Sequence, residues 1–302
     1  MSHDSISFQN ISFTYDTASS PLFEELTVHF PAGWTGVVGA NGTGKTTILK
    51  LATGELKPQR GHVQIPETAT YCPQRTDEVP PMFANLIRAT DGDAWKIKRR
   101  LDIADEWVQR WDSLSHGERK RAQIAVVLWG RPQVLAVDEP TNHLDIEARS
   151  LLAAALRSFR GIGLLVSHDR ELLDTLCRQC LFVEPPEAVM RPGGYTQGSR
   201  QAMKEEEYIR KQYDIAKDVA GRLKREAVRR RDAASRARRR LSKRGLDPKD
   251  HDARDKINLA RVTGKDGVDG KRLRQIDSRL RQARNKQEQY KVKKTYRMGI
   301  WL

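Results

Sequence analysis

Cysteine is scarce in this 302-residue chain, and long apolar runs are missing from it. The three cysteines, Cys72, Cys177 and Cys180, are too few for the disulfide framework of a small secreted domain. No run reaches the ~18 consecutive apolar residues of a membrane-spanning helix. The first residues, MSHDSISFQN, lack the basic and then apolar layout of a signal peptide. We therefore expect a cytoplasmic protein with no membrane span. Cys177-x-x-Cys180 has no second pair beside it, so we interpret it as structural.

Acidic residues are outnumbered by basic residues in only one part of the chain. Residues 1–198 hold 21 Lys and Arg against 24 Asp and Glu, whereas residues 199–302 hold 33 against 15. The last third, with a net charge of +18, therefore contributes the whole of the net +15. Two physically different parts share the chain, and we expect their boundary at 198/199.

Residues 1–198 alternate β-rich runs with helical patterns, which predicts an α/β fold with a largely parallel core sheet. Strands are expected at 6–15, 26–30, 35–38, 63–65, 134–138, 164–166 and 181–183. Helices are expected at 45–52, 117–128, 146–158 and 169–176. A segment rich in Pro and Gly, 185–194, then forms a boundary.

Residues 199–302 show a different, helical periodicity. A heptad seam predicts one long helix from about 200 to 243, and its apolar positions are Ile209, Tyr213, Ala216, Ala220, Leu223, Ala227, Ala234, Ala237 and Leu241. A second seam runs from Leu273 to Tyr290 and is interrupted only by Gln287. Between the seams, residues 252–262 form a possible short helix among glycines. The pattern predicts an α-helical antiparallel hairpin, a coiled coil with a basic tip.

The segment GANGTGKTT lies between an expected strand and an expected helix, which is the setting of a P-loop. Glycines let successive backbone N–H groups point at phosphate oxygens, and the helix N-terminus favours the same anion. We expect Lys45 to reach the β- and γ-phosphates of ATP, and the Thr46 hydroxyl to ligate Mg²⁺. The predicted ATP-binding residues of this loop are Gly39, Asn41, Gly42, Thr43, Gly44, Lys45, Thr46 and Thr47.

The apolar strand 134–138 ends in two adjacent acids, Asp138 and Glu139. Opposite a P-loop, such a pair suits Mg²⁺ and water chemistry. We expect Asp138 to hold Mg²⁺, directly or through water, and Glu139 to orient or deprotonate the attacking water.

Three further motifs, LSHGE at 114–118, PTNHLD at 140–145 and SHD at 167–169, resemble those of the ABC ATPase family. The resemblance implies a P-loop NTPase of the ABC-cassette type. It also implies that His168 contacts the γ-phosphate, that Gln74 lies near Mg²⁺ as a catalytic and metal-site residue, and that Tyr15 stacks on adenine.

The same resemblance assigns Ser115 and Gly117 to the signature motif, which caps the γ-phosphate of ATP bound to the opposite cassette. Asp145 matches the aspartate at the seam of the cassette dimer. His116 stands where the family usually has glycine, so we expect a weakened signature function.

The segment GGYTQG at 193–198, followed by a long charged helix, resembles the corresponding segment of the ABC-F family. The sequence PTNHLD is also typical of that family. Members join two cassettes by a basic helical hairpin and generally act on the ribosome, where several relieve antibiotic inhibition. The resemblance implies that residues 200–295 contact rRNA and tRNA. Independently of this resemblance, a helical rod with a net charge of +18 favours binding to nucleic acid, because counterions are released when its basic residues bind phosphates.

Only one cassette is present, and residues 298–302 look like the start of a second. ATP hydrolysis therefore requires a second cassette, either from another copy or from a C-terminal half. Two alternatives remain open: the ATPase subunit of an ABC exporter, and a DNA-associated ABC ATPase.

Overall fold

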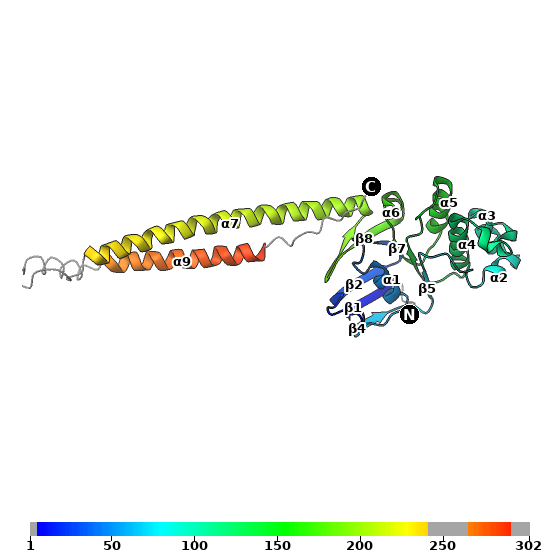
Figure 1. Ribbon diagram of the computed structural model, residues 1–302, viewed down its shortest axis with the longest axis horizontal. Coiled ribbons are helices and arrows are strands. Elements are labelled where there is room, and N and C mark those ends of the chain that lie inside the picture. Colours follow the sequence, from blue (N-terminus) through cyan, green and yellow to red (C-terminus); the bar gives the residue numbers. More distant parts are fainter. Residues whose placement is uncertain (1–4, 241–264, 291–302) are drawn as a thin grey trace, which may run out of the picture. The chain divides into compact units, whose positions relative to one another are not determined.

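The computed structural model describes residues 5–240 and 265–290, with side chains at 5–236 and 274–290 (Figure 1). The described residues divide into two compact units, of which the first ends at Gln201 and the second begins at Ala202. The described part of the first unit is α/β, and that of the second consists of helix. No helix among these described residues is both long and apolar enough to cross a bilayer.

A six-stranded sheet with the order β5-β6-β7-β3-β8-β9 organises the first unit. Its strands are β3 (Gly33–Val38), β5 (Ala69–Cys72), β6 (Val134–Asp138), β7 (Ile162–Val166), β8 (Cys177–Glu184) and β9 (Glu187–Pro192). All neighbouring strands are parallel except β8 and β9. The predicted α/β fold with a largely parallel sheet is confirmed.

Both faces of this sheet are covered. In β6, Leu135 and Val137 point into one apolar cluster, and Val134 and Ala136 point into another. All four side chains are fully buried, as expected for a parallel strand covered on both sides. The first cluster is completed by α4 (His116–Trp129), α5 (Ile146–Arg157) and α6 (Arg170–Leu176). The second cluster is completed by α1 (Lys45–Ala52) and the strands of a second sheet.

The second sheet is antiparallel, with the order β2-β1-β4, and Figure 1 shows it beside α1. Its strands are β1 (Ser5–Phe13), β2 (Phe23–Pro31) and β4 (Arg60–Gln64). The sequence predicts these three strands from their alternating apolar residues. It does not predict that they leave the parallel sheet, because strand pairing is set by contacts distant along the chain.

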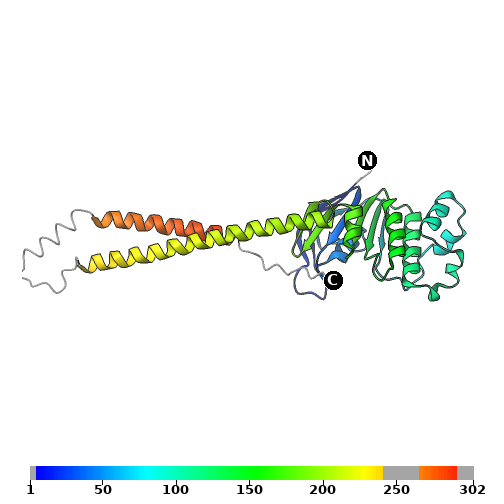
Figure 2. The same ribbon diagram turned by 90° about the horizontal axis from the view of Figure 1, so that it is seen from above.

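A group of short helices beside α4 is missed by the sequence analysis (Figure 2). It consists of α2 (Phe83–Arg88), α3 (Gly92–Arg100) and the 3₁₀ turns η1 (Asp105–Val108) and η2 (Trp111–Ser113). These helices are too short for a clear apolar period. The start of α3 is stabilised by the Asp91 carboxylate, which accepts hydrogen bonds from the N–H groups of Asp93 and Ala94.

Two local expectations at the end of this unit differ from the structure. The Pro- and Gly-rich segment contains a strand, β9, which pairs with β8. Its prolines lie in the turn and at the strand end, where no ladder hydrogen bond is lost. In addition, α7 (Tyr195–Arg240) begins five residues earlier than expected, because the Asp174 carboxylate accepts hydrogen bonds from the N–H and hydroxyl groups of Thr196.

The second unit pairs the remainder of α7 with α9 (Lys265–Gln289). Arg231 lies 2.8 Å from Asp277, and Gln287 donates a 3.3 Å hydrogen bond to the Tyr213 hydroxyl. Advancing along α7 therefore corresponds to going back along α9, and the helices are antiparallel, as predicted.

The predicted seam accounts for the burial pattern of this pair. Ala216, Ala220, Ala227 and Ile276 are buried, and Gln287 is partly buried at its heptad position. Ile209 is an exception, because it remains 40% exposed. The side chains of Ala237 and Leu273, together with Leu241, the possible helix at 252–262 and residues 298–302, lie outside the described residues.

Candidate nucleotide-binding site

The predicted P-loop connects the end of β3 to the start of α1. Gly44 has a φ of +93°, and a Cβ there would lie 2.7 Å from the Phe23 ring. At Gly39, a Cβ would lie 2.6 Å from the Val183 carbonyl oxygen. Both positions therefore require glycine, one for its conformation and both for close packing. Asn41 and Gly42 lie exposed at the turn, and the Thr43 hydroxyl donates a 2.9 Å hydrogen bond to the Ala40 carbonyl.

The Lys45 ammonium group lies within the P-loop, where it is expected to bind phosphate. It donates hydrogen bonds of 2.9 and 3.0 Å to the carbonyls of Gly39 and Ala40. Burial lowers the pKa of Lys45, and the nearby carboxylates of Glu139 and Asp138 oppose this shift. The cation is thus placed where phosphate oxygens can replace the backbone carbonyls as its partners.

The Asp138 carboxylate, at the end of β6, accepts hydrogen bonds from two hydroxyl groups. Thr46 donates a 2.7 Å hydrogen bond to its Oδ2 atom, and Tyr71, on β5, donates one of 3.0 Å to the same atom. Burial raises the pKa of Tyr71, and Asp138 raises it further, so the phenol stays protonated. The sequence analysis predicts Asp138 and Thr46 but misses Tyr71, because nothing in its motif distinguishes it from a core aromatic residue.

Glu139 contacts the next expected catalytic residue, His168. Its Oε2 atom accepts a 3.1 Å hydrogen bond from the His168 backbone N–H, and its Oε1 atom lies 3.3 Å from the imidazole Nε2. Glu139 is 5% exposed, and this burial raises its pKa, against the opposing effect of His168. Its backbone φ of +44° is unusual for a residue with a side chain. It is held there by a 2.8 Å hydrogen bond from its N–H to the Val166 carbonyl.

Tyr15 joins the same group of residues. Its hydroxyl lies 2.7 Å from the hydroxyl of Thr47, at the start of α1. Thr47 is buried, whereas Tyr15 is 43% exposed. The ring therefore lies at the surface and is tied to the P-loop helix, which is the geometry needed for an aromatic ring that stacks on a base.

Gln74 follows β5, and its side chain is exposed. Its backbone carbonyl, like that of Pro73, accepts a hydrogen bond from Lys120, at 3.0 and 2.8 Å. Lys120 is fully buried on α4, where burial lowers its pKa. One turn further along the helix, Gln123 donates a 3.2 Å hydrogen bond to the carbonyl of Arg75. Three consecutive carbonyls are thus held by α4, and the sequence analysis misses both residues that hold them.

The expected signature residues begin α4. Ser115 is the N-cap: its hydroxyl accepts a hydrogen bond from the Glu118 N–H, and its own N–H donates to the Glu118 carboxylate. Gly117 lies in the first turn, where a Cβ would be 3.4 Å from Leu144. The hydroxyl of Ser115 accepts in this arrangement, so its proton remains available for a phosphate oxygen.

Asp145 lies close to these residues, as the N-cap of α5. Its carboxylate accepts a 2.7 Å hydrogen bond from the Ala148 N–H. The ring of His143 meets the ring of His116 edge to face, with 5.7 Å between their centroids. Among the described residues, no hydrogen bond or ion pair joins this second group to the P-loop group.

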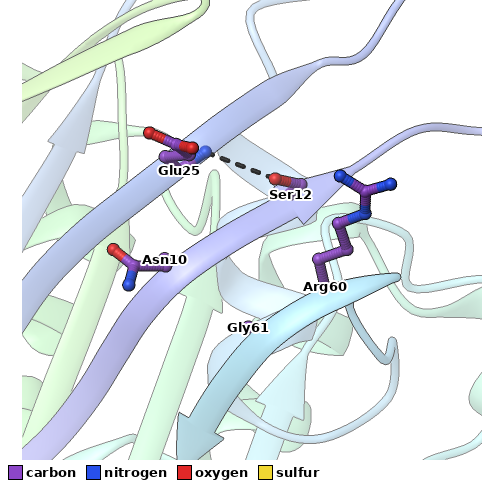
Figure 3. A pocket seen from close by; sticks show the side chains of 5 residues that line it. All are labelled: Asn10, Ser12, Glu25, Arg60 and Gly61. Carbon is purple, nitrogen blue, oxygen red and sulfur yellow. Dashed lines mark hydrogen bonds between the residues drawn. The ribbon is translucent and has the colours of Figure 1, made fainter.

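A polar hollow of about 310 Å³ lies on the antiparallel sheet rather than at the P-loop (Figure 3). It is lined by Asn10, Ser12, Glu25, Arg60 and Gly61. The Glu25 N–H donates a 3.3 Å hydrogen bond to the Ser12 hydroxyl across it. None of the predicted site residues lines this hollow.

Comparison with known proteins identifies relatives of the cassette. The family model described as "ABC transporter" matches residues 23–142. The probable ATP-binding protein YheS of Escherichia coli K12 is 36% identical over 156 residues, which are 47% of this chain and 24% of YheS. The ATP-binding cassette sub-family F member 2 of Bos taurus is 32% identical over 201 residues, which are 62% of this chain and 32% of that protein.

The chain belongs to the ABC-F family of ATP-binding cassette proteins.

Solved structures agree with the fold of this ABC-F cassette. The dimeric structure of MJ0796, a bacterial ABC transporter cassette, matches with a TM-score of 0.52 and 18% identity, over 62% of this chain and 98% of that one. A bacterial Atm1-family ABC exporter with ATP bound matches with a TM-score of 0.55 and 21% identity, over 66% of this chain and 40% of that one. The ABC-F chain spans roughly a quarter to a third of the curated relatives that it matches.

Proposed function

We propose that this ABC-F chain is the cassette and linker of an ATP-hydrolysing protein that acts on the ribosome. The observation that carries the proposal is the basic outer surface of the α7–α9 pair, joined in one chain to a cassette site. A small apolar seam, which includes Ala216 and Ala220, holds the two helices together and leaves the arginines facing outward.

The catalytic part of the proposal rests on Glu139. A carboxylate with a raised pKa is a better base than an ordinary one, provided that it is ionised at the working pH. Lys45 neutralises the β- and γ-phosphates, and Glu139 accepts the proton of the attacking water. The imidazole of His168, 3.3 Å from Glu139, keeps the carboxylate oriented and contacts the γ-phosphate.

The donors at Asp138 fit a magnesium ion. The Thr46 hydroxyl and the Asp138 carboxylate are hard oxygen ligands, and they already lie 2.7 Å apart. When bound, Mg²⁺ neutralises charge on the β- and γ-phosphates. We keep Gln74 as a proposed third contributor, since its loop is held next to the site by α4.

ATP hydrolysis in this proposal requires a second cassette. Ser115, Gly117 and Asp145 lie together around the starts of α4 and α5, and no bond joins them to the described residues of the P-loop group. This arrangement suits a surface that caps ATP held by another cassette, in trans or in a C-terminal half. The dimeric state of the MJ0796 cassette supports such pairing.

Contact with rRNA and tRNA is proposed for the second unit. Arg222, Lys224, Arg225, Arg229 and Arg236 are exposed, and within the described residues none has a carboxylate at ion-pairing distance. Unpaired guanidinium groups suit bidentate contacts to phosphate. The side chains at 238–240, which we also expect to contact RNA, lie outside the described residues. A role in antibiotic resistance and a place in the cytoplasm are part of the same proposal.

The experiment is co-sedimentation of Glu139→Gln with 70S ribosomes, with and without ATP, over a salt series. The substitution removes the carboxylate that acts as the base but keeps the shape of the side chain. ATP is then bound but not hydrolysed, so the ATP-bound state accumulates. We expect pelleting that requires ATP. Glu67→Gln, an exposed carboxylate away from the site, is the matched control and should not trap the complex.

Three other outcomes contradict the proposal in different ways. Pelleting that ignores ATP and fades with salt indicates a charge-driven RNA binder. Preferential binding to competing duplex DNA favours a DNA-associated ABC ATPase. Absence of binding, even when a second cassette is supplied, favours the ATPase subunit of an exporter.

A further inference from the structure

The outer face of α3 carries an exposed tryptophan. This helix packs inward through Ala94 and Ile97, which join the first apolar cluster. Figures 1 and 2 show α3 beside α4, at the edge of the cassette. On the outward side, Trp95 is 56% exposed. A single exposed apolar residue is ordinary on a protein surface, so the meaning of this indole depends on the side chains beside it.

Three cations share the exposed face of α3 with this indole. Arg99, one turn further along α3, places its guanidinium group 5.2 Å from the centroid of the Trp95 ring. Lys96 and Arg100 are exposed and lie in the neighbouring row of the helix. At 100° per residue, the four side chains fall within an arc of about 140°. The result is a continuous aromatic and basic face.

The acids of this region do not neutralise that face, because they are engaged elsewhere. Asp91 caps α3 and accepts from the Trp129 indole, and Asp93 pairs with Arg131. Asp102 pairs with Arg121 at 3.3 Å, and Asp105 pairs with Lys98 at 3.5 Å. Within residues 5–240 and 265–290, Lys96 and Arg100 have no carboxylate at ion-pairing distance.

We propose that Trp95, Lys96, Arg99 and Arg100 form an RNA-binding site in which an unpaired base stacks on Trp95 and the three cations hold the flanking phosphates. Indole rings and guanidinium planes are the surfaces on which proteins stack splayed bases. The positive face is complementary to phosphate. The site belongs to the cassette, so its evidence is independent of α7 and α9.

The test uses photocrosslinking of the full chain. The probe is a 12-nucleotide RNA with a central 4-thiouridine, and mass spectrometry locates the crosslinked peptides. We expect a crosslink at residues 92–100. A competitor RNA with an abasic central position should displace the probe there at least about fivefold less well than the intact RNA, the loss expected for one stacked base.

Variants separate stacking from charge. Trp95→Leu should abolish the crosslink at α3, whereas Trp95→Phe should retain most of it. The double variant Lys96→Gln with Arg100→Gln should lower the salt dependence of crosslinking at that peptide. Tyr208→Leu, which changes another exposed aromatic residue, 59% exposed on α7, is the control and should leave the α3 crosslink unchanged. Circular dichroism melts verify that each variant is folded.

Three results would contradict the proposed RNA-binding site on α3. Crosslinks confined to residues outside α3 would show that RNA does not bind there. A crosslink at α3 that does not distinguish abasic from intact RNA would remove the stacking role. Displacement by a 12-residue polyglutamate peptide as effective as that by RNA would assign the face to an acidic protein. The crosslinking test uses no ATP and no ribosome. Its results can therefore be interpreted even if ATP-dependent ribosome binding is not observed.

Discussion

The buried ammonium group of Lys120 donates a 3.0 Å hydrogen bond to the backbone carbonyl of Gln74. The same group holds the Pro73 carbonyl at 2.8 Å. Lys120→Met keeps the length of the side chain but leaves these acceptors without a donor. We expect the unfolding free energy to fall by about 1–3 kcal/mol, and amide exchange at residues 74–77 to become faster. Thermal unfolding and hydrogen exchange measure the two effects.

Lys57→Met serves as the control, because Lys57 is exposed and its loss should change neither quantity. A Lys120→Met protein with unchanged exchange at residues 74–77 would show that the lysine does not hold this loop.

Thr46→Val tests the proposed magnesium site, since it removes the hydroxyl that lies 2.7 Å from Asp138. ATP affinity in the presence of Mg²⁺ should fall by about tenfold or more, on the scale of losses around metal ligands. Affinity measured in EDTA should change little, because the P-loop backbone is intact. Calorimetric titration distinguishes the two conditions. Thr53→Val, at the end of the same helix, is the control and should bind Mg²⁺ and ATP normally.

Tyr15 allows stacking to be separated from hydrogen bonding. Tyr15→Phe loses only the 2.7 Å contact with Thr47, so ATP affinity should fall by about threefold or less. Tyr15→Ala also loses the ring, and affinity should fall by about tenfold. Equal effects of the two substitutions in a fluorescent-nucleotide titration would refute stacking on adenine.

Gln287 is the polar residue in the seam between α7 and α9. It donates a hydrogen bond to Tyr213, but polar seam residues set register at a cost in stability. Gln287→Leu should therefore raise the stability of the helical hairpin by about 1 kcal/mol, followed as the helical circular dichroism signal on heating. Gln282→Leu, on the exposed face of α9, should have no such effect. A lower melting temperature for Gln287→Leu would show that the hydrogen bond outweighs the buried leucine.

The surroundings of His116 predict a dependence of stability on pH. Burial lowers the pKa of His116 below its ordinary value of 6.5, and Lys120, His143 and Arg119 lower it further, against Asp77. The unfolded state then binds the proton more readily than the folded state. The contribution of His116 to stability is therefore present above pH 6.5 and declines as the pH falls below it.

His116→Asn should remove part of this decline, so its melting temperature should fall less than that of the wild type between pH 7 and pH 5. His62→Asn, an exposed histidine on β4, should follow the wild type. Parallel pH curves for the wild type and His116→Asn would contradict the lowered pKa.

Motif residues could be predicted from the sequence because their chemistry depends on local order. Gly44 and Lys45 follow a strand and begin a helix, and both lie where the pattern predicts. Lys120 and Tyr71 could not be predicted, because their partners, Gln74 and Asp138, lie 46 and 67 residues away. Nothing in α4 or β5 alone distinguishes them from ordinary surface or core residues.

The sequence by itself determined the cassette motifs, the charge division near residue 198 and the heptad seam, since each follows from residues close together along the chain. Only the tertiary structure decided that β1, β2 and β4 form a sheet of their own and that Glu139 faces His168. It also decided that α3 turns Trp95 outward while its acids are engaged elsewhere. These features depend on packing between distant segments, in which burial and hydrogen bonding select one arrangement among many that local patterns allow.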